Sequence, residues 1–82
     1  MKLNELRKEI DNIDNDIINL LIKRFNVVLE VKQYKIDNNI SVLDKAREDI
    51  IKNKIINYQS NFNNNILSIY ESILKESKDL QK

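Results

Sequence analysis

Apolar residues recur at alternating intervals of three and four over the first 34 positions, with one interruption at Arg24. They are Leu3, Leu6, Ile10, Ile13, Ile17, Leu20, Val27, Val31 and Tyr34. A repeat of 3.5 residues is typical of the contact stripe of a left-handed coiled coil. The chain contains no Pro or Gly, so nothing interrupts a single helix from about Asn4, a good N-cap residue, to about Ile36.

This first helix is long for the chain that carries it. From Leu3 to Lys35 it would extend about 50 Å, whereas a compact domain of 82 residues has a diameter of about 30 Å. We therefore expect the helix to lie along another chain, most simply along a second copy of itself.

The rest of the chain predicts two further helices. Asp37–Asn39 supplies turn residues without glycine, and a short link over residues 40–43 leads to a second helix that begins near Asp44. Either Ser41 or Asp44 would cap it. The polar segment Ser60–Asn65 predicts a second turn that runs into the first turn of a third helix.

The third helix carries two apolar stripes, and one of them ends in polar residues. That stripe comprises Leu67, Tyr70 and Leu74, and it continues with Ser77 and Gln81. No repeat or linker divides the chain. The fold class predicted is therefore all-α, with a single domain of three helices over residues 1–82.

The amino-acid composition excludes several kinds of functional site. The formal charge is +1, and the chain has no His, Cys or Gly. This excludes ordinary zinc sites, Ser-His-Asp catalysis, disulfides and glycine-rich phosphate loops, and it gives no basic excess for nucleic acid or for a membrane surface. No apolar run is long enough to span a membrane or to form a signal peptide. We expect a cytoplasmic protein that uses no metal.

Only three arginines occur in a chain that otherwise uses lysine: Arg7, Arg24 and Arg47. Arginine differs from lysine in its planar, bidentate recognition of carboxylates and phosphates. Arg24 interrupts the apolar stripe, where it could fix the register of helix pairing or extend to solvent. Alternatively it meets a buried anion, because an unpaired buried charge is costly.

Other polar residues form small groups at helical spacing. Asp44, Arg47 and Glu48 lie at i, i+3 and i+4, which suits an N-cap with a surface ion pair as well as a binding site. Lys35 lies one turn beyond the last valine of the stripe. Each group alone favours an ordinary surface role, and Ser77 with Gln81 would be a frayed helix end.

Together these positions resemble the all-helical chorismate mutase family. The motifs are Leu6-Arg7, Ile10-Asp11-x-Ile13-Asp14, Leu20-Leu21-x-x-Arg24, Val31-x-x-x-Lys35, Val42-x-Asp44-x-x-Arg47-Glu48 and Ser77-x-x-x-Gln81, and they cover nearly the whole chain. The resemblance implies an intertwined homodimer. It also implies the rearrangement of chorismate to prephenate, in phenylalanine and tyrosine biosynthesis, without cofactor, metal or covalent intermediate.

The resemblance also implies roles for eight residues. Arg7 and Arg24 would bind the two carboxylates of the substrate, and Arg47 and Ser77 would support that site. Since Arg7 and Arg24 are 17 residues apart, about 26 Å along a helix, one small substrate cannot contact both in one chain. An antiparallel pair centred near residues 15–21 would bring Arg7 opposite the Arg24–Lys35 stretch of the other chain.

The remaining implied roles concern the reacting oxygen and the ring. Lys35 and Gln81 would donate hydrogen bonds to the ether oxygen, where charge grows as the C–O bond opens. Asp44 and Glu48 would bind the ring hydroxyl and orient Lys35 and Arg47. Lys35, Gln81, Arg24 and Glu48 are thus the expected catalytic residues.

Three alternative functions remain open from the sequence. An isochorismate pyruvate-lyase would use the same scaffold and a similar set of cations. A regulatory partner of another shikimate-pathway enzyme would keep the scaffold without the reaction. A non-enzymatic dimerisation module would need none of Arg24, Lys35 and Glu48 for its binding.

Overall fold

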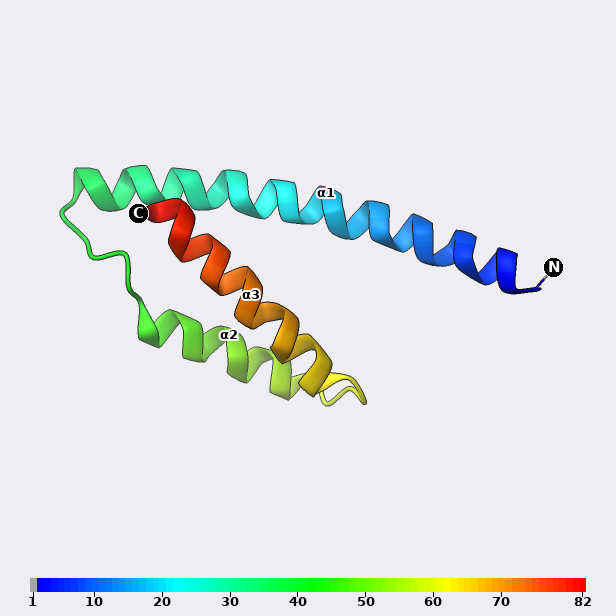
Figure 1. Ribbon diagram of the computed structural model, residues 1–82. Helices are drawn as coiled ribbons and strands as arrows, with labels where there is room; N and C mark the ends of the chain where they lie inside the picture. The colour runs from blue at the N-terminus through cyan, green and yellow to red at the C-terminus, as the bar shows by residue number, and fades with distance from the viewer. Residues whose placement is uncertain (1) are drawn as a thin grey trace.

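The computed structural model describes residues 2–82, and this part of the chain contains three helices and no strand. They are α1 (Lys2–Asp37), α2 (Lys45–Asn57) and α3 (Asn63–Gln81). Figure 1 shows α3 returning from the far end of α2 to the C-terminal half of α1. The all-α prediction with a long first helix is confirmed, but Asn4 is not its N-cap, because the chain is already helical at Lys2.

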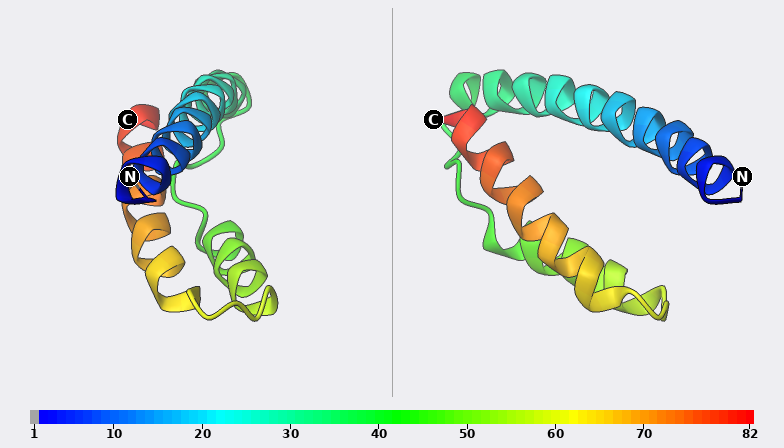
Figure 2. Two further views of the ribbon diagram at one scale, coloured as in Figure 1. Left: turned by 90° about the vertical axis from the view of Figure 1, so that its right-hand side faces the viewer. Right: turned by 45° about the vertical axis from the view of Figure 1, so that its right-hand side comes forward.

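The molecule is elongated because of α1. Its principal dimensions are 56 × 25 × 15 Å and its radius of gyration is 16.0 Å, against about 12 Å for a compact domain of this length. Both α1 and α2 pack against α3. In Figure 1 and in the right-hand view of Figure 2, the N-terminal half of α1 extends beyond the other two helices.

The turn after α1 works without glycine. The amide of Ile40 donates to the carbonyl of Lys35 (2.8 Å), and the amide of Asn39 donates to that of Ile36 (3.4 Å). This is the Schellman pattern that ends many helices, and it needs a residue in the left-handed region. Asn39 takes that conformation, with φ of 55°, and asparagine tolerates it better than most residues. The turn predicted at Asp37–Asn39 is confirmed.

Of the two N-cap residues predicted for the second helix, Ser41 and Asp44, the structure has Asp44. Asp44 is the N-cap, and its Oδ1 accepts a hydrogen bond from the backbone amide of Arg47 at 2.9 Å. The turn after α2 contains Gln59 with φ of 52°, and Asn63 Nδ2 donates to the carbonyl of Ile56. These contacts fix the angle at which α3 returns along α2.

The buried core is small. Ile55, Leu74 and Ser77 are the buried residues in the described chain. By contrast, the six apolar residues that repeat along the N-terminal half of α1 are 42–64% exposed. We call this surface the N-terminal stripe: Leu3, Leu6, Ile10, Ile13, Ile17 and Leu20. A contiguous apolar surface of this kind is a hallmark of an interaction site. None of the helices within residues 2–82 combines the length and the hydrophobicity needed to cross a membrane.

Candidate active site

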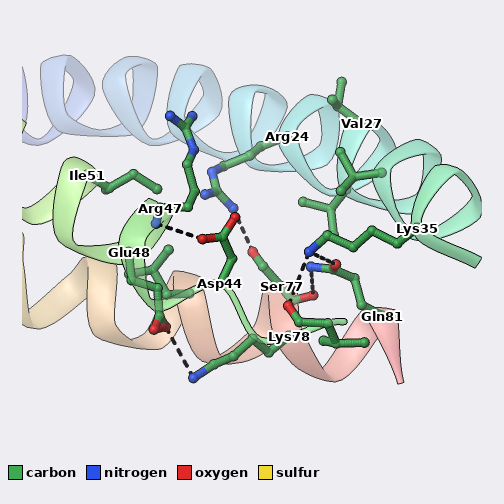
Figure 3. A pocket seen from close by; sticks show the side chains of 14 residues that line it. Arg24, Val27, Lys35, Asp44, Arg47, Glu48, Ile51, Ser77, Lys78 and Gln81 are labelled. Carbon is green, nitrogen blue, oxygen red and sulfur yellow. Dashed lines mark hydrogen bonds and ion pairs between the residues drawn. The ribbon is translucent and has the colours of Figure 1, made fainter. Parts of the chain in front are cut away.

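A pocket of about 390 Å³ lies where the three helices meet. It receives side chains from the C-terminal half of α1, the start of α2 and the last turns of α3 (Figure 3). Seven of the eight residues predicted from the sequence line it: Arg24, Lys35, Asp44, Arg47, Glu48, Ser77 and Gln81. Residues up to 57 positions apart in the sequence therefore converge on one cavity.

Arg24 crosses from α1 to α3. Its Nη1 donates to the Ser77 hydroxyl at 2.6 Å, and Ser77 in turn donates to the backbone carbonyl of Ile73 at 2.7 Å. Ser77 is only 5% exposed, so its side chain has little freedom to move. The two hydrogen bonds therefore fix the position of the Arg24 guanidinium. The interruption of the apolar stripe thus places a half-buried cation in the pocket, with further N–H groups of its five left to bind an anion.

Lys35 and Gln81 form a second link between α1 and α3. Lys35 Nζ donates to Gln81 Oε1 at 2.9 Å and to the carbonyl of Val42 at 3.1 Å. The amide nitrogen of Gln81 donates to the backbone carbonyl of Ser77 at 3.1 Å. An ammonium group has three N–H donors and a side-chain amide has two. Each residue therefore keeps one donor for a further acceptor in the pocket.

The acidic residues from the start of α2 have separate partners. Asp44 uses one oxygen to cap the helix. Glu48 pairs with Lys78 of α3 through its Oε1, at 3.2 Å from Nζ, and no hydrogen bond joins it to Lys35 among residues 2–82. Figure 3 shows the Glu48 and Lys78 side chains meeting at the α3 side of the pocket.

The pocket carries an excess of positive charge. Four cationic side chains line it, Arg24, Lys35, Arg47 and Lys78, against the two carboxylates of Asp44 and Glu48. Apolar walls from Val27, Val28, Val31, Ile51 and Leu74 reduce its contact with water, which strengthens each charge interaction inside. Such a cavity suits a small, compact dianion with an apolar body.

Two further residues compare differently with the sequence prediction. Arg7 does not line the pocket, which agrees with the expectation that this residue serves another copy. Lys78 does line it, although the sequence analysis did not select it. The available signal was its spacing, because Lys78 follows the buried Leu74 by four residues and so shares its helix face.

Comparison with known protein families identifies the family of this chain. The family described as chorismate mutase type II matches residues 6–82. The chain belongs to this family. The match includes all eight predicted residues, from Arg7 to Gln81.

Individual relatives agree with this assignment. A chorismate mutase of Methanocaldococcus jannaschii is 34% identical over 99% of this chain and 85% of the relative. A bifunctional chorismate mutase/prephenate dehydratase of Buchnera aphidicola subsp. Schizaphis graminum is 39% identical over 93% of this chain. The chain spans about a fifth of the length of that bifunctional relative, 20%. No solved structure gives a significant match.

Proposed function

We propose that this protein is a chorismate mutase, which rearranges chorismate to prephenate without a cofactor. The observation that carries the proposal is the convergence of Arg24, Lys35 and Gln81 on one pocket with an excess of positive charge. Family membership and the M. jannaschii relative, itself named a chorismate mutase, support it. The product would enter phenylalanine and tyrosine biosynthesis.

The reaction needs positioning and charge rather than a nucleophile. One C–O bond of the ether breaks and one C–C bond forms within a single substrate molecule, so no group is transferred to the protein. Holding the flexible dianion in its compact, reactive shape removes the entropic part of the barrier. Donors aimed at the ether oxygen then stabilise the charge that grows there in the transition state.

The hydrogen bonds of the pocket suit these two tasks. Arg24, held by Ser77, would bind one substrate carboxylate, and Arg47 adds positive charge at the same wall. The free donors of Lys35 and Gln81 would point to the ether oxygen. Asp44 and Glu48 each keep a carboxylate oxygen for the ring hydroxyl, since their other oxygens bind Arg47 and Lys78.

A homodimer would complete the site. The N-terminal stripe is exposed and regular, and its 3.5-residue repeat fits a second copy of the same helix. An apolar groove between α1 and α3, lined by Ile17, Leu20, Ile66, Ile69 and Ile73 among others, offers further surface for it. A second pocket beside this groove shares Arg24 and Arg47 with the candidate active site. Arg7 of the partner subunit would enter through this second pocket and bind the second carboxylate of the substrate.

The decisive experiment follows the loss of chorismate absorbance on addition of purified protein. We expect wild-type protein to consume chorismate and to yield prephenate. Arg24→Ala should reduce kcat/KM by about a hundredfold or more, because the pocket loses a half-buried cation that would pair with a carboxylate of the substrate. Lys23→Ala, which removes an exposed neighbouring cation, should change it little.

Helical circular dichroism identifies variants that fail to fold. Folded wild-type protein that leaves chorismate unchanged would contradict the proposal. Consumption of isochorismate in its place, with release of pyruvate, would move the assignment to the lyase.

A further inference from the structure

Lys78 is the charged residue of the pocket that the sequence analysis did not select and to which the proposed mechanism gives no contact with the substrate. Its pairing is unlike that of the other lysines with ion pairs in the described chain. Lys45, Lys75 and Lys82 pair with carboxylates three or four residues away, in side chains that are 42–72% exposed. Lys78 pairs across two helices with Glu48, and the side chain of Glu48 is only 16% exposed.

This pair faces the pocket. Both Lys78 and Glu48 line it, and the close-up shows Lys78 reaching from α3 to the end of the Glu48 side chain (Figure 3). The contact occupies Glu48 Oε1. A carboxylate has two acceptor oxygens, so Oε2 stays available to the cavity.

We propose that Lys78 is a positioning residue that holds the Glu48 carboxylate in place for the hydroxyl group of the ligand. The inference rests on the proposed function for the identity of that ligand. A glutamate side chain loses rotamer freedom when a ligand fixes it, and Lys78 removes part of that cost before the ligand arrives. The ammonium group also offsets the repulsion between the Glu48 carboxylate and a dianionic ligand.

A double-mutant cycle tests whether Lys78 acts through Glu48. We expect Lys78→Met to lower kcat/KM for chorismate by about three- to tenfold, the range for a partly exposed ion pair at a binding site. The loss should fall mainly on KM, because the hydroxyl group is present in both substrate and transition state. In a Glu48→Gln background, Lys78→Met should have no further effect.

Two comparison variants separate positioning from other effects of charge. Lys75→Met removes a lysine of the same helix that pairs with Asp79 and does not line the pocket, and it should leave kcat/KM unchanged. Lys78→Arg keeps a cation that can pair with Glu48, and it should restore most of the activity. Fully additive effects of Lys78→Met and Glu48→Gln would overturn the proposal, because Lys78 would then act on the ligand independently.

A purely structural role for Lys78, as a link between α2 and α3, would give a different result. If Lys78 only joins the helices, its loss should lower thermal stability, and activity per folded molecule should stay at the wild-type level. That result would also overturn the proposal. Under the proposal, activity per folded molecule falls in Lys78→Met whether or not the melting temperature changes, because the pair of Lys78 with Glu48 acts on binding of the ligand.

A readout without substrate keeps this inference distinct from the proposed function. The carboxyl carbon of Glu48, labelled with ¹³C, reports its surroundings by NMR. We expect Lys78→Met to shift this resonance and Lys75→Met to leave it in place. If wild-type protein consumed no chorismate, the proposed function would fail while this measurement still tested the pair. An unchanged Glu48 resonance in Lys78→Met would contradict the positioning role.

Discussion

Gln81 offers the pocket a hydrogen-bond donor that does not depend on pH. Its carbonyl oxygen accepts from Lys35, and one of its two amide hydrogens is used by the carbonyl of Ser77. The second hydrogen is free for the ether oxygen of a substrate. An amide does not titrate, so activity of the wild-type protein should change little between about pH 5 and about pH 8.

Substitution of Gln81 by Glu should create an acid requirement. An ionised carboxylate has no proton to donate, so Gln81→Glu should be poorly active at neutral pH. Its activity should rise about tenfold for each pH unit towards the ordinary carboxyl pKa of about 4.3, and should then level off. Parallel pH profiles of kcat/KM for the two proteins check this, and a flat profile for Gln81→Glu would contradict it.

The neighbouring carboxylate does not interfere with this measurement. Hydrogen bonds from Lys75 and then Lys82 lower the pKa of Asp79 from its ordinary value of 3.8. Because the pKa is lower in the folded state, the stabilisation is fully present above about pH 4 and is lost as the pH falls through the folded value. Asp79 therefore stays ionised throughout the tested range, and the last turn of α3 keeps its ion pairs.

At the residue scale, the sequence pattern predicts which residues line the pocket but not which of them contact one another. Arg24, Ser77 and Gln81 each break an apolar stripe, and a polar residue on a buried helix face must find a partner. That rule selects them without stating which partner they have. The pairing of Glu48 with Lys78 depends on the distance between α2 and α3, and no local pattern in the sequence encodes that distance.

At the scale of elements, Asp44 has two roles that substitution can separate. As the N-cap of α2 it binds the backbone amide of Arg47, and as a pocket residue it presents a negative charge. Asp44→Ala removes both. It should destabilise the protein by about 1 kcal/mol, a fall of about 4–8 °C in the melting temperature, and should reduce activity.

Asp44→Asn is the matched control, because asparagine is an equally good N-cap. It should retain the melting temperature and still lose activity through the missing charge. Thermal unfolding followed by circular dichroism, beside kcat/KM, checks both variants. If Asp44→Asn kept wild-type activity, Asp44 would be a cap and nothing more.

The helix boundaries were predictable where capping chemistry is local. Asp44 caps α2 through its own side chain, and Asn39 takes the left-handed conformation, both preferences of single residues. The start of α1 was not predictable in this way. Asn4 is a good cap residue, yet the apolar repeat already includes Leu3, and α1 begins at Lys2.

At the scale of the whole molecule, a single chain buries few of the apolar residues that its sequence contains. Within residues 2–82, Ile55 and Leu74 are the buried apolar residues, whereas the N-terminal stripe is exposed. Small domains with so limited a core usually gain stability by association. The long helix and its regular repeat were predictable from the sequence. The groove between α1 and α3 was not, since it depends on how α3 returns.

Mixing two inactive variants tests whether the site is shared between subunits. Arg7→Ala and Arg24→Ala chains, each expected to be poorly active alone, are unfolded together and refolded as a mixture. In a shared site, Arg24 of one chain acts with Arg7 of the partner subunit. A mixed dimer therefore has one intact site and one site that lacks both arginines.

Random pairing gives mixed dimers in about half of the population, so about a quarter of wild-type activity should return. The same two proteins refolded separately and then combined should stay at the activity of the parents until subunits exchange. If each site were built within one chain, every site in a mixed dimer would carry one lesion, and co-refolding would restore nothing. Recovery near a quarter would thus require two interlocked chains, with the exposed half of α1 reaching across to the pocket of its partner.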